Sequence, residues 1–150
     1  MPGSLFDTSV WLAAVFPTHP MHPPAQRCLQ TATPVEPAVF CRYTQQSFLR
    51  LATTPTLLKA YGATGLTNRD ALTVLGALMA LPQVCEQEEP TGTFSLWQHM
   101  AALNTASPKV WMDAYLAAFA ISGGLGLTSL DLDFRKFATH GLKLNPILID

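Results

Sequence analysis

The chain has 150 residues and a formal net charge of −1; 49% of its residues are hydrophobic and only 13% are charged. This length and composition predict one domain, residues 1–150, with a substantial buried core. No apolar run is long enough to span a bilayer, no basic leader with a cleavage site is visible, and three widely spaced cysteines favour free thiols. We therefore expect a cytoplasmic protein that neither spans a membrane nor depends on disulfides.

Near the N-terminus a single acidic residue, Asp7, lies in a long stretch that otherwise contains no Lys, Arg, Asp or Glu. The residues before it, Ser4–Phe6, have the character of a strand. Thr8 or Ser9 is a candidate N-cap for a helix over Val10–Phe16. Asp7 would then lie at the C-terminal end of a strand, which is where open α/β sheets place their ligands.

Prolines dominate the next segment and predict a loop over residues 17–24, followed by a helix over about Ala25–Thr31. Pro37–Cys41 is a short apolar run of strand character. It leads into a helical pattern over Arg42–Ala52, for which Thr44 is a plausible N-cap.

The middle of the chain continues to alternate between helical and extended patterns. Thr67 and Asp70 have the spacing of a capping box, so an amphipathic helix is expected over Ala71–Leu81. Val84–Cys85 fits a short edge strand, and Phe94–Leu103 fits another helix.

The most apolar helix of the chain is expected after Ser107-Pro108, with Ser107 as N-cap and Pro108 at the first helical position. Gly123-Gly124 predicts its end. Because this helix is apolar on nearly every face, it should be largely buried. It carries one acid, Asp113, and a buried carboxylate is costly unless a partner stabilises it.

Gly126–Leu130 then predicts a buried strand, and Asp131 and Asp133 follow directly after its end. A brief helix over Phe134–Thr139 and a last strand over Pro146–Ile149 complete the pattern. Strands that alternate with helices imply an α/β fold. We expect a three-layer α/β/α sandwich with a mainly parallel central sheet.

Four aspartates are candidates for one cation site at the sheet edge. Carboxylates gathered at one place stay ionised only when a cation lies between them, and oxygen-only ligands favour Mg²⁺ or Mn²⁺. Such ions activate a water and stabilise the charge that develops on a phosphodiester, which points to a nuclease. The alternative is that two acids are on the surface and one caps a helix. The four residues are Asp7, Asp113, Asp131 and Asp133.

Four segments of the chain resemble the PIN-domain family, and more closely the VapC-type ribonuclease toxins of bacterial toxin–antitoxin pairs. Each segment is weak by itself, whereas four in this order and spacing are fairly specific. They are Leu5–Leu12, Cys41–Leu51, Asp113–Ala118 and Thr128–Phe134.

The resemblance implies a PIN-like fold and a Mg²⁺- or Mn²⁺-dependent endoribonuclease that cleaves RNA, often tRNA or rRNA. It also implies inhibition by a VapB-type antitoxin and assembly as a homodimer. By position, Asp7, Asp113 and Asp131 match the acids of the family, and Asp133 is near enough to assist.

One residue departs from the family pattern, because many members carry a Glu where this chain has Gln45. A glutamine offers an amide oxygen, with which it could orient a metal-bound water, but it lacks the charge and cannot act as a base. The departure motivates a second hypothesis, a catalytically weakened PIN-like module that binds RNA or its antitoxin.

Several other side chains are candidates for contact with the substrate. Lys109 and Lys136 are basic residues near the acids, although any one of them taken singly could be a solvated surface residue. A third hypothesis, a phosphatase that uses Asp131-Leu-Asp133, is disfavoured because that pair follows the first strand in Asp-x-Asp phosphatases. The substrate-binding candidates are Arg42, Arg50, Thr128 and Arg135.

Overall fold

A five-stranded sheet forms the centre of the protein, for which a computed structural model describes residues 3–147. Every strand pair is parallel, as the alternating sequence pattern predicted, and the strand order is β3-β2-β1-β4-β5. The strands are β1 (Ser4–Phe6), β2 (Ala38–Phe40), β3 (Val84–Glu86), β4 (Gly126–Ser129) and β5 (Leu144–Pro146).

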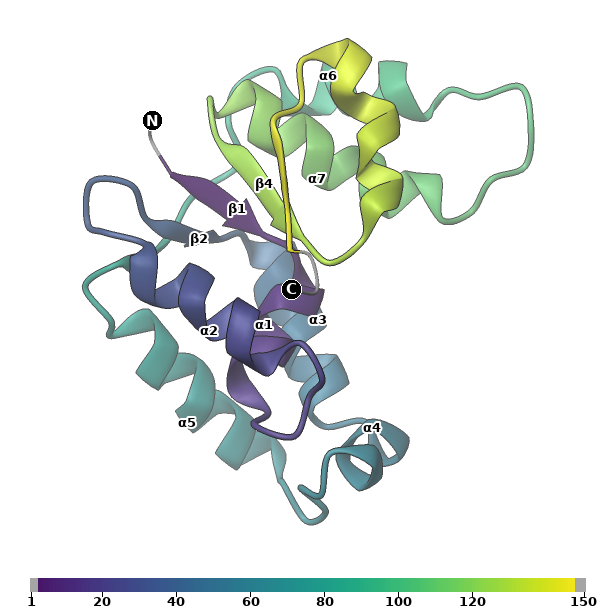
Figure 1. Cartoon of the computed structure of the whole chain (residues 1–150). Coiled ribbons are helices and arrows are strands. Elements are labelled where there is room, and N and C mark those ends of the chain that lie inside the picture. The colour runs from purple at the N-terminus through teal and green to yellow at the C-terminus, as the bar shows by residue number, and fades with distance from the viewer. Residues whose placement is uncertain (1–2, 148–150) are drawn as a thin grey trace.

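Helices cover both faces of the sheet (Figure 1). They are α1 (Thr8–Val15), α2 (His22–Thr31), α3 (Arg42–Ala52), α4 (Pro55–Ala60), α5 (Asn68–Met79), α6 (Thr93–Ala101), α7 (Val110–Ser122) and the 3₁₀ helix η1 (Leu132–His140). None of these described helices is long and apolar enough to cross a membrane.

Successive residues of the strands pack into two separate cores. Leu5, Val39 and Leu127 contact the core formed by α6, α7 and η1. Phe6 and Phe40 contact the opposite core, which the helices from α1 to α5 cover. Because both faces of the central strands are buried, β2 is apolar at every position, as is typical of a parallel sheet. The expected three-layer α/β/α architecture is confirmed.

The first two helices begin earlier than the sequence suggested. Neither Thr8 nor Ser9 is the N-cap of α1; that position belongs to Asp7, whose side chain makes no cap hydrogen bond. The Ser9 hydroxyl donates to the Asp7 carboxylate instead. Helix α2 starts at His22 rather than Ala25, since the prolines that follow His22 fit a first turn, where no backbone N–H is needed.

Two other residues that were predicted as N-caps, Thr44 and Ser107, do not occupy N-cap positions. Thr44 is the third residue of α3, and its hydroxyl accepts from the backbone N–H of Cys41, the residue at the N-cap position. Ser107 is not the N-cap of α7, which begins at Val110 with Lys109 at the N-cap position; the Ser107 hydroxyl pairs with that of Thr105.

At the C-terminus, η1 extends beyond the brief helix predicted over Phe134–Thr139. The last strand overlaps its predicted range only at Pro146, because β5 begins at Leu144. Ile147 was predicted to be in this strand but lies outside it, and residues 148–149 lie outside the described residues.

The capping box at the start of α5 is present as predicted and gives a first test. The Thr67 hydroxyl accepts from the Asp70 N–H at 3.1 Å, and the Asp70 carboxylate accepts from the Thr67 N–H at 2.9 Å. We expect Thr67→Ala to lower the free energy of unfolding by about 1 kcal/mol, measured by urea denaturation. Thr64→Ala, at an exposed threonine in the preceding turn, is the control. Equal losses in both variants would contradict a role for the cap.

Candidate active site

The site lies where β1 and β4 pair side by side and the chain leaves both strands at the same edge. The register pairs Phe6 of β1 with Thr128 of β4. Asp7 is the first residue after β1, and Asp131 is the second residue after β4. The Asp7 N–H donates to the Thr128 carbonyl at 2.9 Å. From β1 the sheet continues through β2 on one side and β4 on the other, which makes this edge a topological switch point.

Two serine hydroxyls hold the Asp7 carboxylate. Ser129 donates to its Oδ2 at 2.8 Å, and Ser9 donates to the same oxygen at 3.2 Å. The Ser129 Oγ also accepts from the Asp131 N–H at 2.9 Å, so one serine links both acids. Burial raises the pKa of Asp7 above its ordinary value, and the two hydroxyls act against that shift.

Asp113 is the buried acid of α7, and only 9% of its surface is exposed. Its Oδ2 is buried and has no hydrogen-bond partner among the described residues. Burial raises the pKa of Asp113, while the charges of Lys109 and Lys136 lower it. An unpaired buried acceptor carries a desolvation cost, so this oxygen is available for a cation.

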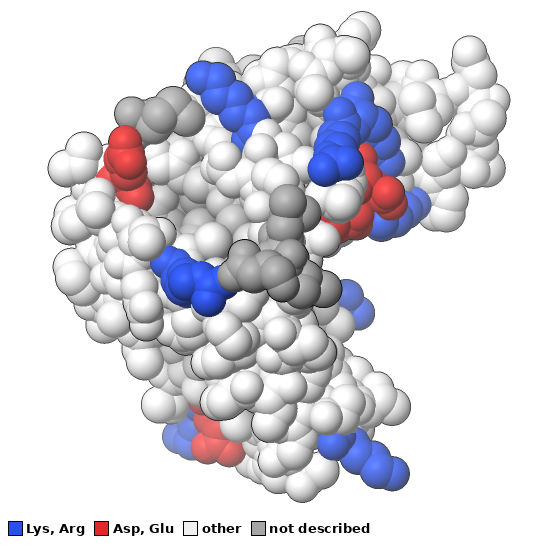
Figure 2. Space-filling model, in the orientation of Figure 1, with Lys and Arg blue, Asp and Glu red and all other residues white. Residues whose placement is uncertain are grey.

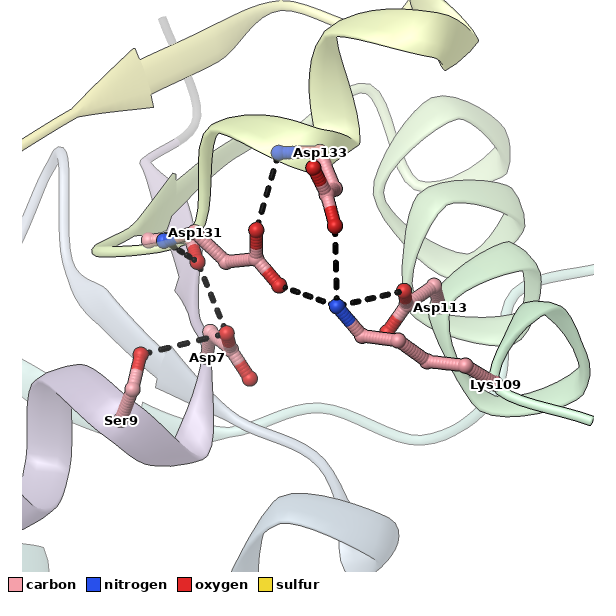
Figure 3. Close-up of polar contacts among 7 residues, drawn as sticks. Asp7, Ser9, Lys109, Asp113, Asp131 and Asp133 are labelled. Carbon is pink, nitrogen blue, oxygen red and sulfur yellow. Dashed lines mark hydrogen bonds and ion pairs between the residues drawn. The ribbon is translucent and has the colours of Figure 1, made fainter.

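Asp131 and Asp133 meet at the start of η1 (Figure 3). The Asp131 Oδ1 accepts from the Asp133 N–H at 2.9 Å. The Lys109 ammonium donates to the Oδ2 of Asp131 at 2.8 Å and to the Oδ2 of Asp133 at 3.1 Å. The hydrogen bond from Lys109 is the main reason why the pKa of Asp131 is lowered, and the same bonds raise the pKa of Lys109.

The chemistry of these donors fits a divalent cation. Carboxylate oxygens are the ligands that Mg²⁺ and Mn²⁺ prefer. The Oδ2 of Asp113 has no hydrogen-bond partner among the described residues, and such an ion would supply a partner. Within residues 3–147, however, no three His, Cys, Asp or Glu side chains are already grouped as metal ligands. The ammonium of Lys109 lies between the aspartates instead (Figure 3).

The hydrogen bonds of Gln45 are made to residues other than the aspartates. Its amide oxygen accepts from an Arg42 guanidinium N–H at 2.7 Å, and its amide nitrogen lies 3.8 Å from the Met79 sulfur of α5. The side chain is buried between α3 and α5. The described hydrogen bonds of Gln45 therefore do not connect it to the acids.

Tyr43 and Ser47 are a pair on α3 that the sequence did not single out. Burial raises the pKa of Tyr43, Ser47 acts against that shift, and the charges of Asp7 and Asp113 add to it. The phenol is thus close enough to both acids to sense their charge. Tyr43 and Ser47 are four residues apart, which places both side chains on one face of α3, but nothing in the sequence shows which face meets the acids.

Two of the predicted substrate contacts are engaged within the protein. An Arg42 Nη2 pairs with the Glu86 carboxylate at 2.8 Å. Thr128 is buried in β4, and its hydroxyl is 2.7 Å from that of Ser4. Neither side chain is among those that contact the Lys109 ammonium.

Arg50 and Arg135 are exposed, so both can reach a ligand. Lys136, on η1, is the cation of that helix whose charge lowers the pKa of Asp113 and Asp131. In Figure 2, acidic and basic side chains lie together beside a hollow on the right of the view. This arrangement puts positive charge next to the acids, where a polyanion would need it.

Comparison with known proteins identifies the family. No protein-family model matches the chain. Curated proteins named ribonuclease VapC41, from two strains of Mycobacterium tuberculosis, are 41% identical over 141 residues, which cover 93% of this chain and 97% of theirs.

Solved structures share the fold at low sequence identity. VapC20 of M. tuberculosis, described as a sarcin–ricin loop cleaving toxin, aligns with a TM-score of 0.60 and 18% identity over 93% of this chain and 96% of its own. VapBC2 of Rickettsia felis, bound to a promoter DNA fragment, aligns with a TM-score of 0.63 and 11% identity over 95% and 97%. VapBC-1 of nontypeable Haemophilus influenzae aligns with a TM-score of 0.60 and 12% identity over 95% and 96%.

The fold is that of a PIN-like domain, and aspartates lie at its switch point. The chain belongs to the VapC family of ribonuclease toxins. The resemblance drawn from the four sequence segments is thereby confirmed.

Proposed function

We propose that this protein is a Mg²⁺- or Mn²⁺-dependent endoribonuclease that hydrolyses phosphodiester bonds of tRNA or rRNA. The observation that carries the proposal is the gathering of Asp113, Asp131 and Asp133 around one cationic position, with Asp7 linked to Asp131 through Ser129. The name of the VapC41 relatives supports RNA as the substrate, and the VapC20 neighbour supports rRNA as a target.

The residues of the chain have separate roles in this proposal. Asp7, Asp113 and Asp131 hold the divalent cation, and Asp133 assists; the ion would supply an activated water and offset the charge on the phosphodiester. Ser9 and Ser129 fix the orientation of Asp7.

Basic side chains around the acids would hold the RNA. Lys136 is exposed on η1 and already acts on the aspartates. Arg50 and Arg135 are further exposed cations that could contact the RNA strand. Contacts of this kind are made to the phosphate backbone and position the strand without reading its bases.

The position of Gln45 keeps the second hypothesis open. Its amide oxygen accepts from Arg42 and its amide nitrogen faces Met79. Gln45 therefore does not add to the acidic cluster the carboxylate that a glutamate on α3 would supply. A binding module without cleavage activity would have the same fold. The two functions differ in whether RNA is cut when a divalent cation is supplied.

The expected partners are a VapB-type antitoxin and a second copy of the chain in the cytoplasm. Two of the three solved structures described above are VapBC structures, which supports an antitoxin as a partner. Phe94, Trp111 and Met112 expose large apolar surfaces on α6 and α7. A partner that covered them would remove this apolar area from water.

Cleavage of RNA is the direct test of the proposed function. Purified protein free of antitoxin should cut total RNA into discrete fragments with Mn²⁺ or Mg²⁺, because the acids need the cation to act. EDTA should stop the reaction, and an excess of Mn²⁺ should restore it. The fragments are resolved on denaturing gels and mapped by sequencing of their ends.

The folded state must be verified by circular dichroism in the same samples. Folded protein that leaves RNA intact in every metal would overturn the nuclease. RNA binding measured in those samples would then favour the module.

A further inference from the structure

Lys109 places a positive charge of the chain itself between the acids of the site (Figure 3). Its ammonium is 2.8 Å from Asp131 Oδ2, 3.1 Å from Asp133 Oδ2 and 3.9 Å from Asp113 Oδ2. These carboxylates come from two places in the chain, α7 and the start of η1. One lysine therefore bridges the elements that a bound cation would bridge.

The ammonium does not complete the site. Three carboxylates and one ammonium leave a net charge of −2 (three minus one), and no residue within 3–147 donates a hydrogen bond to the Oδ2 of Asp113. At 3.9 Å the lysine is too far from that oxygen to donate one. A divalent cation in place of the ammonium would reduce the net charge of the three carboxylates further, to −1 (three minus two), and would supply the missing partner.

Lys109 is also free to leave the acids. Its side chain is 61% exposed, and it occupies the N-cap position of α7 without a side-chain cap hydrogen bond. A long flexible stem carries the charge, so rotation into solvent costs little packing.

We propose that Lys109 is an internal competitor of the divalent cation: it bridges Asp113, Asp131 and Asp133 in the metal-free protein and leaves their oxygens when the metal binds. The inference rests on the proposed function, because it requires a metal at these acids. It predicts that metal binding releases a cationic side chain beside the site. The same lysine therefore weakens the affinity for the metal and stabilises the protein without it.

The test is a Mn²⁺ titration by calorimetry in the absence of RNA. We expect Lys109→Met to lower the Kd for Mn²⁺ about three- to tenfold, because the metal no longer displaces an ion pair. The metal-free variant should also melt at a lower temperature than wild type, since its carboxylates lose their counter-ion. Lys109→Arg, which keeps the charge, should bind Mn²⁺ no more tightly than wild type. Lys59→Met, at an exposed lysine of α4, is the matched control and should leave both values unchanged.

The outcomes separate this inference from the proposed function. Folded Lys109→Met that binds Mn²⁺ with the wild-type Kd, or more weakly, overturns the competition. Wild-type protein that neither binds Mn²⁺ nor cleaves RNA overturns the metal-dependent nuclease itself. If Lys109→Met does not fold, Lys109→Gln, which keeps hydrogen-bond donors without the charge, carries the same expectation.

Discussion

Replacement of Asp113 by Asn should reduce metal-dependent RNA cleavage about 100-fold or more, because loss of one ligand charge removes several kcal/mol of transition-state stabilisation. Without metal, the same variant should be more stable than wild type by about 1 kcal/mol, since an uncharged amide replaces a buried carboxylate whose Oδ2 accepts no hydrogen bond from the described residues. Cleavage is measured under single-turnover conditions, and stability by urea denaturation.

The sign of the stability change follows from the direction of the pKa shift. Burial raises the pKa of Asp113 in the folded protein, so folding favours the protonated form. The stability that this proton contributes is present below the unfolded pKa and is lost as the pH rises through the folded pKa. The amide of the Asp113→Asn variant would imitate the protonated form at neutral pH, so the gain in stability of this variant should shrink in acid.

Glu88→Gln is a matched control that neutralises an exposed acid in the turn after β3. It should alter neither cleavage nor stability by a measurable amount. A loss of cleavage in both variants would show that net charge, rather than a specific ligand, controls the reaction. Wild-type cleavage by Asp113→Asn would remove Asp113 from the site.

Strands β1 and β2 were predictable because each lies in a short, largely apolar run. Ser4–Phe6 matched its predicted range, and Pro37–Cys41 contains β2. Helix starts were less predictable, because several nearby side chains could act as caps and only tertiary contacts select one. The hydroxyl of Ser9, for example, bonds to an active-site carboxylate instead of capping its helix. Helix α4 was missed because Pro55 ends one helix and also opens the next.

The acids of the site were predictable because Asp7 and Asp113 are isolated charges in apolar segments, where only a function or a partner explains them. Lys109 was recognised only as a basic neighbour. A lysine before a helix is ordinary in sequence, and its contacts depend on how α7 packs beside η1. Tyr43 and Ser47 carry no charge, so the sequence held no signal for their approach to the acids.

Trp11 gives the largest expected effect on stability. It is fully buried in α1, and its ring stacks on Phe40 of β2 with 3.7 Å between centroids and an interplanar angle of 7°. Trp11→Ala should lower the free energy of unfolding by about 3–5 kcal/mol, because a large cavity would open between α1 and the sheet. Urea denaturation measures the loss. Since α1 begins directly after Asp7, the cavity should also loosen the site and reduce the stabilisation by Mn²⁺.

Two comparisons show whether the loss comes from packing. The indole N–H of Trp11 is buried and has no acceptor in the part of the chain that the structure describes, so Trp11→Phe keeps an aromatic ring and removes an unsatisfied donor. Its cost should therefore be well below that of the alanine variant. Trp111→Ala removes a ring that is 52% exposed and should cost less than about 1 kcal/mol. If Trp11→Ala were no more damaging than Trp111→Ala, α1 could not be held on the sheet by this stacked pair, and another contact would have to fix the position of Asp7.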